Sequence, residues 1–264
     1  MNAKKNPQKD VPAEDRIQHL NQILRAIRNV NQLIIREKDR DRMLQAVCDL
    51  LVENQGYYNA WAVLLDEDGE ISLAVEAGLG DTFDSLVERI KQGDLLACGQ
   101  RALAQADVVA IEDLSKMCAD CPLAGRYAGR GALAVRLAHR GEIYGWLCTS
   151  IDADLVNEEE ELALFQEVAG DIAFALHDMA LEEAREQALA ALYHTERYYR
   201  ALIENSPDGI VMVGAEGQIE FASPAALRIF GYDDAEAFMS QQPADLAHPD
   251  DLPIVLDVLD RFSR

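Results

Sequence analysis

The sequence predicts an α+β fold, in which an antiparallel sheet with helices on one face is followed by one long helix and a second, partial domain. Three observations support this prediction. Short apolar runs separated by turn signals occupy residues 60–150, helical spacing flanks them, and residues 157–205 contain no Pro and a single Gly. Runs bounded by Gly and Asp indicate strands in hairpins, whereas the Ala, Leu and Glu of the last segment favour a helix.

Length, composition and charge limit the classes of protein to which the chain can belong. Its 264 residues suffice for about two domains, and 49% of them are apolar, enough to form buried cores. The formal net charge of -23 argues against nucleic acid as a partner. Since no apolar run is long enough for a transmembrane helix and the N-terminus does not resemble a secretory signal, we expect a cytoplasmic protein. Five cysteines, an odd number, suit a reducing compartment.

The N-terminal part is predicted to be a disordered polar tail followed by helices. Residues 1–13 are polar and contain two Pro, whereas residues 14–54 have helical spacing. Within residues 14–40, apolar side chains and one Asn form a seam at steps of three and four, which is typical of a coiled coil. The seam consists of Ile17, Leu20, Leu24, Ile27, Asn31 and Ile34. The charged residues 36–42 either interrupt this helix or form its solvated face.

Two hairpins frame the predicted sheet. The turn Asp-Glu-Asp-Gly at 66–69 separates the first pair of strands, and His139-Arg140-Gly141 separates the last pair. An irregular stretch, residues 117–131, carries a cysteine pair and precedes the second hairpin. The predicted strands are 60–65, 71–76, 108–112, 132–137 and 143–150, and the predicted short helices are 84–90 and 100–106.

A long helix is predicted over residues 157–205, and we expect it to dimerise. Its apolar residues recur at steps of three and four in two runs, with a change of phase near Glu182. A narrow stripe on so long a helix cannot be buried against itself, so a homodimer through residues 14–40 and 157–205 is expected. Two helices joined by a polar linker are the alternative. The first run is Leu162, Phe165, Ala169, Ile172, Leu176 and Met179, and the second is Leu181, Ala184, Ala188, Ala191, Thr195, Tyr198 and Leu202.

Residues 41–179 resemble a GAF domain, the small-molecule sensing module of bacterial signalling proteins. The resemblance rests on GYYNAWAVLLDEDG (56–69), on VVAIEDL (108–114) and above all on residues 131–176, where strands lead through acidic residues into a helix ending AGDIAFAL. It implies a six-stranded antiparallel sheet with the N- and C-terminal helices on one face. It also implies a ligand pocket on the other face, under the loops between Gly78 and Gly131.

Residues 194–264 resemble the N-terminal part of a PAS domain. The resemblance rests on residues 195–238, from TERYYRALIENSPDG to GYDDAEAF, and on AHPDD at 247–251. The residues themselves predict a strand at 209–213, a strand at 218–221 and a helix at 224–230. Because a complete PAS sheet has five strands, we expect an incomplete domain or a piece of a longer protein.

Three cysteines are candidates for a metal or redox site. Cys118 and Cys121 are three residues apart, which suits chelation of a soft metal or a disulfide, and Cys98 is the third candidate. A structural role, a thiol redox switch, and a metal, iron–sulfur or haem-linked site all stay open. Cys48 and Cys148 are expected to be plain buried thiols.

Four polar residues are candidates for the binding of a small ligand in the pocket. They are Asp120, Arg126, Tyr127 and Arg130. The two arginines could hold an anionic ligand by paired hydrogen bonds, and solvated loop charges are the alternative. The residues that mark cyclic-nucleotide binding in GAF domains are not assembled here, and no cysteine lies in the context of a bilin attachment site.

No catalytic centre is evident in the sequence, which contains no P-loop. His177 and His194 lack the Arg and Pro that complete the phosphoacceptor motif of a histidine kinase. We therefore expect a dimeric sensory-input segment that detects a small ligand or a redox or metal state. The long helix would relay the signal to the PAS part and to an output domain, most often a histidine kinase. The alternatives are the input of a diguanylate cyclase or phosphodiesterase, a ligand-free dimerisation scaffold, and an enzyme of the free methionine sulfoxide reductase type.

Overall fold

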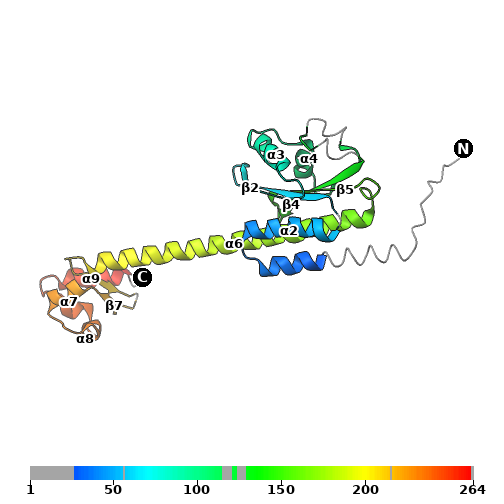
Figure 1. Ribbon diagram of the computed structural model, residues 1–264. Coiled ribbons are helices and arrows are strands. Elements are labelled where there is room, and N and C mark those ends of the chain that lie inside the picture. The colour runs from blue at the N-terminus through cyan, green and yellow to red at the C-terminus, as the bar shows by residue number, and fades with distance from the viewer. Residues whose placement is uncertain (1–26, 56, 115–120, 124–128, 215, 263–264) are drawn as a thin grey trace. The chain divides into compact units, whose positions relative to one another are not determined.

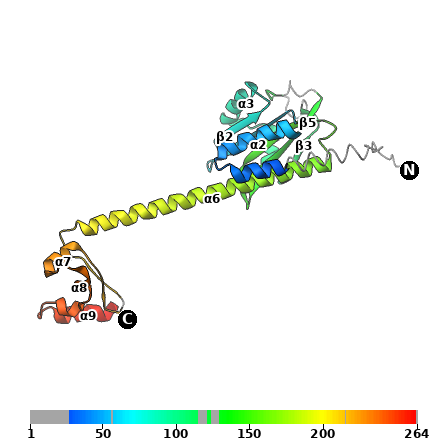
Figure 2. The same ribbon diagram turned by 60° about the horizontal axis from the view of Figure 1, so that its bottom comes forward.

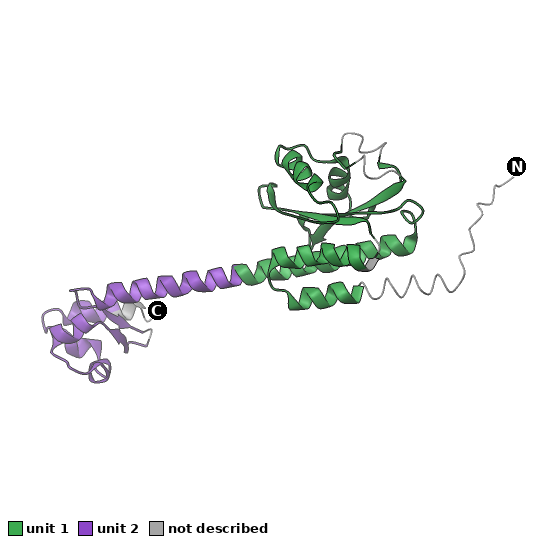
Figure 3. Ribbon diagram, viewed as in Figure 1, with its two compact units in different colours: residues 1–183 green, residues 184–264 purple. Residues whose placement is uncertain are grey.

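The computed structural model describes residues 27–262 except 56, 115–120, 124–128 and 215 (Figure 1). The chain divides into two compact units between Glu183 and Ala184, which fall within one continuous helix (Figure 3). The predicted tail at 1–13 and the first half of the N-terminal seam lie outside the described residues.

A five-stranded antiparallel sheet forms the centre of the first unit, in the order β2-β1-β5-β4-β3. Its five strands match the five predicted from the sequence, and the described residues contain no counterpart of the sixth strand that the resemblance implies. The strands are β1 (Asn59–Leu65), β2 (Ile71–Ala77), β3 (Val109–Ile111), β4 (Arg130–His139) and β5 (Glu142–Asp152).

A glycine permits the close approach of the two central strands β1 and β5. Gly145 pairs with Leu64 and has a φ of 151°. A Cβ atom at this position would lie 1.9 Å from the carbonyl oxygen of Val63. The Cβ atom of any other residue would clash with β1 and force the two strands apart. Glycine is therefore required at this position.

Helices cover one face of this sheet, as predicted. They are α2 (Arg40–Gln55) and α6 (Glu159–Glu204), and a helical segment at residues 27–36 lies next to these two helices on the side away from the sheet (Figures 1 and 2). Residues 37–39 are not helical, so the charged stretch does interrupt the N-terminal helix. Side chains of α2 and α6, among them Met43, Val47, Phe165 and Ile172, form the core on this face.

The described residues of the N-terminal seam pack partly against the core of their own domain. Ile27 and Ile34 are half-buried against it, and their neighbour Val30, outside the seam, is fully buried in it. The side chain of Asn31 forms a hydrogen bond with Asp171 of α6. The described part of the seam thus packs partly within its own domain, and the expected contact of the seam with a second copy of the chain stays a prediction.

The two predicted runs on α6 have different environments. In the first run, Phe165, Ala169, Ile172 and Leu176 are buried against the sheet of the first unit. In the second run, Leu181, Tyr198 and Leu202 are all more than half exposed. The change of phase near Glu182 therefore marks the point where one face of the helix is no longer covered and a different face carries the apolar residues.

Helices α3 (Thr82–Lys91) and α4 (Ala97–Ala104) cover the opposite face of the sheet (Figure 1). Their apolar side chains form a second core with Trp61 of β1 and Trp146 of β5. The α4 helix begins three residues earlier than the predicted range 100–106, which places Cys98 in its first turn.

The second unit contains a two-stranded antiparallel sheet of β6 (Val211–Val213) and β7 (Ile219–Ala222). Helix α7 (Pro224–Phe230) has the predicted bounds, because Ser223 caps its first turn and Gly231 ends it in the left-handed conformation. The remaining elements are α8 (Ala235–Met239), the 3-10 helix η2 (Pro243–Leu246) and α9 (Leu252–Phe262). None of the helices described in either unit combines the length and apolar character needed to cross a membrane.

Candidate functional site

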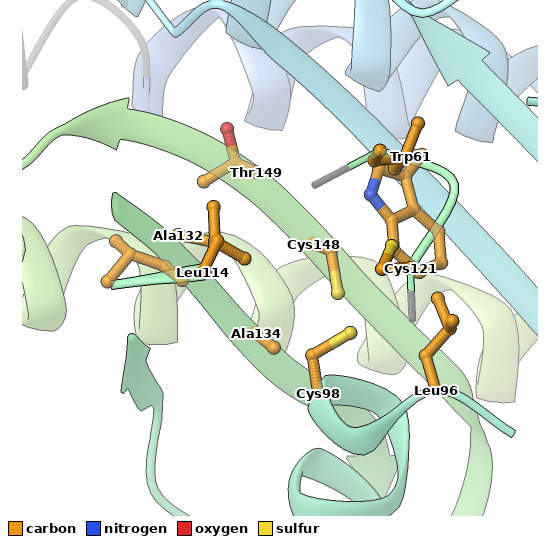
Figure 4. Close-up of a pocket in the computed structure, with 11 residues that line it drawn as sticks. Trp61, Leu96, Cys98, Leu114, Cys121, Ala132, Ala134, Cys148 and Thr149 are labelled. Atoms are coloured by element: carbon orange, nitrogen blue, oxygen red, sulfur yellow. The ribbon is translucent and has the colours of Figure 1, made fainter. Parts of the chain in front are cut away.

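A small cavity lies between the sheet and α4, on the face opposite the long helix (Figure 4). Its volume is about 20 Å³, room for a group the size of one or two water molecules. Among the described lining residues, the side chains with polar groups are three cysteines, one threonine and one tryptophan, and the others are aliphatic. The residues that determine its character are Trp61, Cys98, Cys121, Ala134, Cys148 and Thr149.

The alternation of side chains along the strands positions the floor of this cavity. Successive residues of a strand point to opposite faces, so Ala132 and Ala134 of β4 face α4, whereas Leu133 between them is buried in the core beneath. Ala134 pairs with Cys148 of β5 across the ladder. These small side chains leave the space that larger residues would fill.

The first turn of α4 is held tightly against β5. A Cβ atom on Gly99 would lie only 3.1 Å from the indole ring of Trp146, which is fully buried. Cys98 immediately precedes this glycine, and Cys148 lies two residues after Trp146 on the same face of β5. The sulfur atoms of Cys98 and Cys148 point into the same space (Figure 4).

The structure locates two of the three candidate cysteines at this cavity, while Cys118 lies outside the described residues. Cys98 is buried and Cys121 is partly exposed, and both line the cavity. Cys148 is buried as predicted, but it also lines the cavity. Its position two residues from Trp146, in a strand flanking the predicted pocket, was the signal that could have identified it.

The other cysteine differs from these three. Cys48 lies on α2 in the core on the opposite face of the sheet, and burial raises the pKa of its thiol well above the usual range. Within the described residues, no group of three or more His, Cys, Asp or Glu side chains is placed to hold a metal ion. A metal site formed by the predicted set would therefore need Cys118.

The polar candidates are only partly described. Asp120, Arg126 and Tyr127 lie outside the described residues. Arg130 is not among the residues that line the cavity. Its guanidinium carbon stacks 3.2 Å from the centre of the Tyr58 ring. The Tyr58 hydroxyl donates a hydrogen bond of 2.6 Å to Asp152, which raises the pKa of Tyr58.

Strand β5 connects the cavity with the long helix. Cys148 faces the cavity, whereas its neighbour Leu147 and the nearby Ile151 belong to the core that contains α6. A displacement of β5 caused by a change on the cavity side would therefore alter the packing of α6, because close-packed interiors transmit displacement.

A polar cluster joins the β4–β5 hairpin to α6 close to the point where the helix leaves the first core. The Tyr144 hydroxyl is 2.8 Å from Nδ1 of His177 and donates a hydrogen bond of 2.7 Å to Glu142. His139 contacts the His177 ring, with 5.0 Å between their centroids, and the ring of Phe174. The hydrogen bonds from Tyr144 and His177 lower the pKa of Glu142. The sequence placed His139 only in a hairpin turn and gave no sign of this cluster.

Comparisons with known proteins agree with this architecture. The family model of the GAF domain matches residues 37–177, and that of the PAS domain matches residues 197–263. None of the curated proteins matches the chain.

Several solved structures have a similar fold. The GAF domain of a phosphoenolpyruvate-protein phosphotransferase from Coxiella burnetii superposes with a TM-score of 0.50 at 20% identity, over 62% of this chain and 98% of that one. Free methionine-R-sulfoxide reductase from Neisseria meningitidis gives a TM-score of 0.47 at 15% identity, over 69% and 99%. The corresponding GAF domain from Acinetobacter gives 0.46 at 18% identity, over 62% and 96%. At 20% identity, the likeness to the Coxiella burnetii domain concerns the fold alone. Because the GAF model covers more than half of its residues, this chain belongs to the GAF-domain family, and in it the GAF domain is followed by a PAS domain.

Proposed function

We propose that this chain is the sensory-input segment of a signal-transduction protein, in which the GAF cavity receives a small ligand and α6 carries the resulting change toward the PAS domain. The observation that supports the proposal best is the double role of β5. Its residue Cys148 faces the cavity, while Leu147 and Ile151 pack in the core that contains α6. Ligand binding and helix packing are therefore coupled through one strand.

The described lining of the cavity favours a small, uncharged ligand. Its walls are apolar, and the Thr149 hydroxyl already donates a hydrogen bond of 2.7 Å to the Asn59 carbonyl oxygen. No charged side chain is among the lining residues that the structure describes. A charged ligand would lose its hydration there without compensation, which is costly.

The second copy that we propose as partner would contact the exposed face of α6. The apolar spacing of the second run continues back through His177 to Phe174, which is 55% exposed. From Phe174 to Leu202 the stripe extends for about 42 Å along the helix. Such a stripe is typical of a two-stranded coiled coil. The described residues of the N-terminal seam are already partly buried in their own domain, so we propose α6 as the main contact, beside the contact predicted for residues 14–40.

The output domain is proposed to be a histidine kinase, and a diguanylate cyclase or phosphodiesterase is the alternative. Both rest on the usual association of GAF and PAS domains with these outputs and not on a residue of this chain. A ligand-free dimerisation scaffold is the competing function. A sensor should bind a ligand in the cavity, whereas a scaffold should bind none.

A substitution that fills the cavity can test whether a change there reaches α6, even though the ligand is not identified. In the full chain, Ala134→Leu adds volume to the cavity wall, and Ala104→Leu adds the same volume at an exposed position of α4. Hydrogen–deuterium exchange of the α6 amides is the readout. We expect Ala134→Leu to change exchange in α6 and Ala104→Leu to leave it unchanged. A folded Ala134→Leu protein with unaltered α6 exchange would contradict the relay.

A further inference from the structure

We propose that Cys98 and Cys148 form a reversible disulfide when hydrogen peroxide enters the cavity. This inference rests on the proposed function, since it makes the GAF cavity a peroxide-responsive sensor. It assigns the reactive pair to α4 and β5, in place of the neighbouring Cys118 and Cys121 that the spacing in the sequence favoured.

The packing of α4 on β5 places both thiols at the same cavity. Gly99 lies so close to Trp146 that even a methyl group would crowd the ring, and this contact fixes the first turn of α4 over the strand. Cys98 precedes Gly99, and Cys148 shares the face of Trp146. Both thiols line the same cavity, and their sulfur atoms point into the same space (Figure 4).

The two thiols have different environments that suit different roles. Cys98 is the second residue of α4, where the positive end of the helix offsets part of the cost of forming a thiolate in apolar surroundings. It is 7% exposed, whereas Cys148 is 3% exposed. Cys98 is therefore the attacking sulfur, and Cys148 is the thiol that resolves the intermediate.

The chemistry balances with hydrogen peroxide as the oxidant. The Cys98 thiolate attacks hydrogen peroxide, an S–O bond forms as the O–O bond breaks, and the released hydroxide takes up a proton. The product is a sulfenic acid at Cys98. The sulfur of Cys148 then attacks Cys98, a disulfide forms and water leaves. Two thiols are oxidised in total, and one hydrogen peroxide is reduced to two molecules of water.

The size of the cavity selects the oxidant. A volume of about 20 Å³ admits one or two non-hydrogen atoms. Hydrogen peroxide meets this limit, whereas a peptide disulfide is many times larger. The lining is also apolar, so an uncharged oxidant enters more readily than an ion.

A disulfide between these residues would act directly on the relay. It would join α4 covalently to β5 beside Leu147, whose side chain packs in the core with α6. The disulfide would thus change the packing on the cavity side of β5, as a bound ligand is proposed to do.

The test uses the full chain, reduced and then exposed to hydrogen peroxide, with thiol titration and mass spectrometry of the peptides. We expect the loss of two of the five thiols and a mapped Cys98–Cys148 bond. The Cys118→Ser/Cys121→Ser double variant should behave in the same way. Cys48→Ala is the matched control, because Cys48 lies in the other core and should not influence the reaction.

Cys148→Ala separates the two steps of the reaction. Without the resolving thiol, the sulfenic acid should persist at Cys98 and be trapped there by dimedone, and no disulfide should form. A bond mapped to Cys118 and Cys121, or two thiols lost from Cys148→Ala, would overturn the proposal, as would a wild-type protein that keeps all five thiols. In that case Ala134→Leu could still alter α6 exchange, so the failure of this inference and that of the sensory function are distinguishable.

Discussion

The Tyr57 hydroxyl donates a hydrogen bond of 3.1 Å to the carboxylate of Glu161, and both side chains are buried although 104 residues separate them in sequence. Tyr57 lies just before β1, and Glu161 lies in the first turn of α6. Burial, and then the negative charge of Glu161, raise the pKa of Tyr57 well above its usual range. The contact fastens the start of the long helix to the sheet.

Removal of this hydrogen bond should destabilise the first unit. In Tyr57→Phe the buried carboxylate loses a donor, so we expect the free energy of unfolding to fall by about 1–3 kcal/mol. Glu161→Gln keeps an acceptor oxygen and should cost less. Urea unfolding of the full chain, followed by the fluorescence of its tryptophans, measures both. Equal stability of wild type and Tyr57→Phe would show that the contact contributes nothing.

The strands of the GAF domain could be predicted because local signals mark both their ends. The hairpins have Gly at their turns, and the strand interiors are apolar. Helix α7 was predicted with its exact bounds, because Ser223 and Gly231 are strong start and stop signals. Helix α4 begins earlier than predicted, since Gly99 disfavours a helix locally and its packing against Trp146 outweighs that preference.

The partner of each apolar seam could not be predicted from spacing. Ile27 and Ile172 have the same periodicity as Leu181, but the first two contribute to the core of their own domain and the third is 61% exposed. Periodicity shows that one face of a helix is apolar, but it does not show which surface covers that face. The position of Cys148 at the cavity could not be predicted for a similar reason. A buried cysteine in a strand has the same sequence context whether its side chain packs against other residues or borders a cavity.

The cluster of Glu142, Tyr144 and His177 predicts a pH-dependent contact between the hairpin and α6. The pKa of Glu142 is lowered below 4.5, so the folded state favours its charged form. Its contribution to stability is present above that pH and is lost as the pH falls through the lowered pKa. Amide exchange in the hairpin should therefore accelerate in acid.

Glu142→Gln provides the comparison for this acid effect. The variant carries no carboxylate at this position, so its hairpin exchange should depend less on pH than that of the wild type over the same acid range. Exchange must be corrected for its intrinsic pH dependence before the two proteins are compared. Identical corrected profiles would show that Glu142 does not hold the hairpin on the helix.

The buried Ser223 should be important for the stability of the PAS unit. Its hydroxyl oxygen accepts hydrogen bonds from the amides of Ala226 at 3.2 Å and Ile210 at 3.0 Å. Ser223→Ala removes the helix cap and leaves both amides without this acceptor, so we expect the free energy of unfolding of the unit to fall by about 1–2 kcal/mol. Exchange of the α7 amides in Ser223→Ala measures this cost. Ser240→Ala, which removes an exposed hydroxyl from the same unit, should have little effect.

The exposed stripe of α6 predicts that one tyrosine controls dimerisation and that a nearby tyrosine does not. Tyr198 and Tyr193 are 58% and 64% exposed and lie five residues apart on the same helix. In the heptad that contains Leu181 and Leu202, Tyr198 occupies a seam position, whereas Tyr193 lies on the outer side. A charge at the seam is desolvated in a dimer, and a charge on the outer side stays in water.

Sedimentation equilibrium of the full chain distinguishes the two positions. Tyr198→Glu should weaken self-association at least about tenfold, which corresponds to roughly 1.4 kcal/mol. Tyr193→Glu changes the net charge by the same amount and should associate like the wild type. This control matters, because the formal charge of the chain is already -23 and general repulsion alone could favour the monomer. If both variants weaken association equally, repulsion and not the seam explains the loss. If neither does, the exposed stripe of α6 is not the contact between copies.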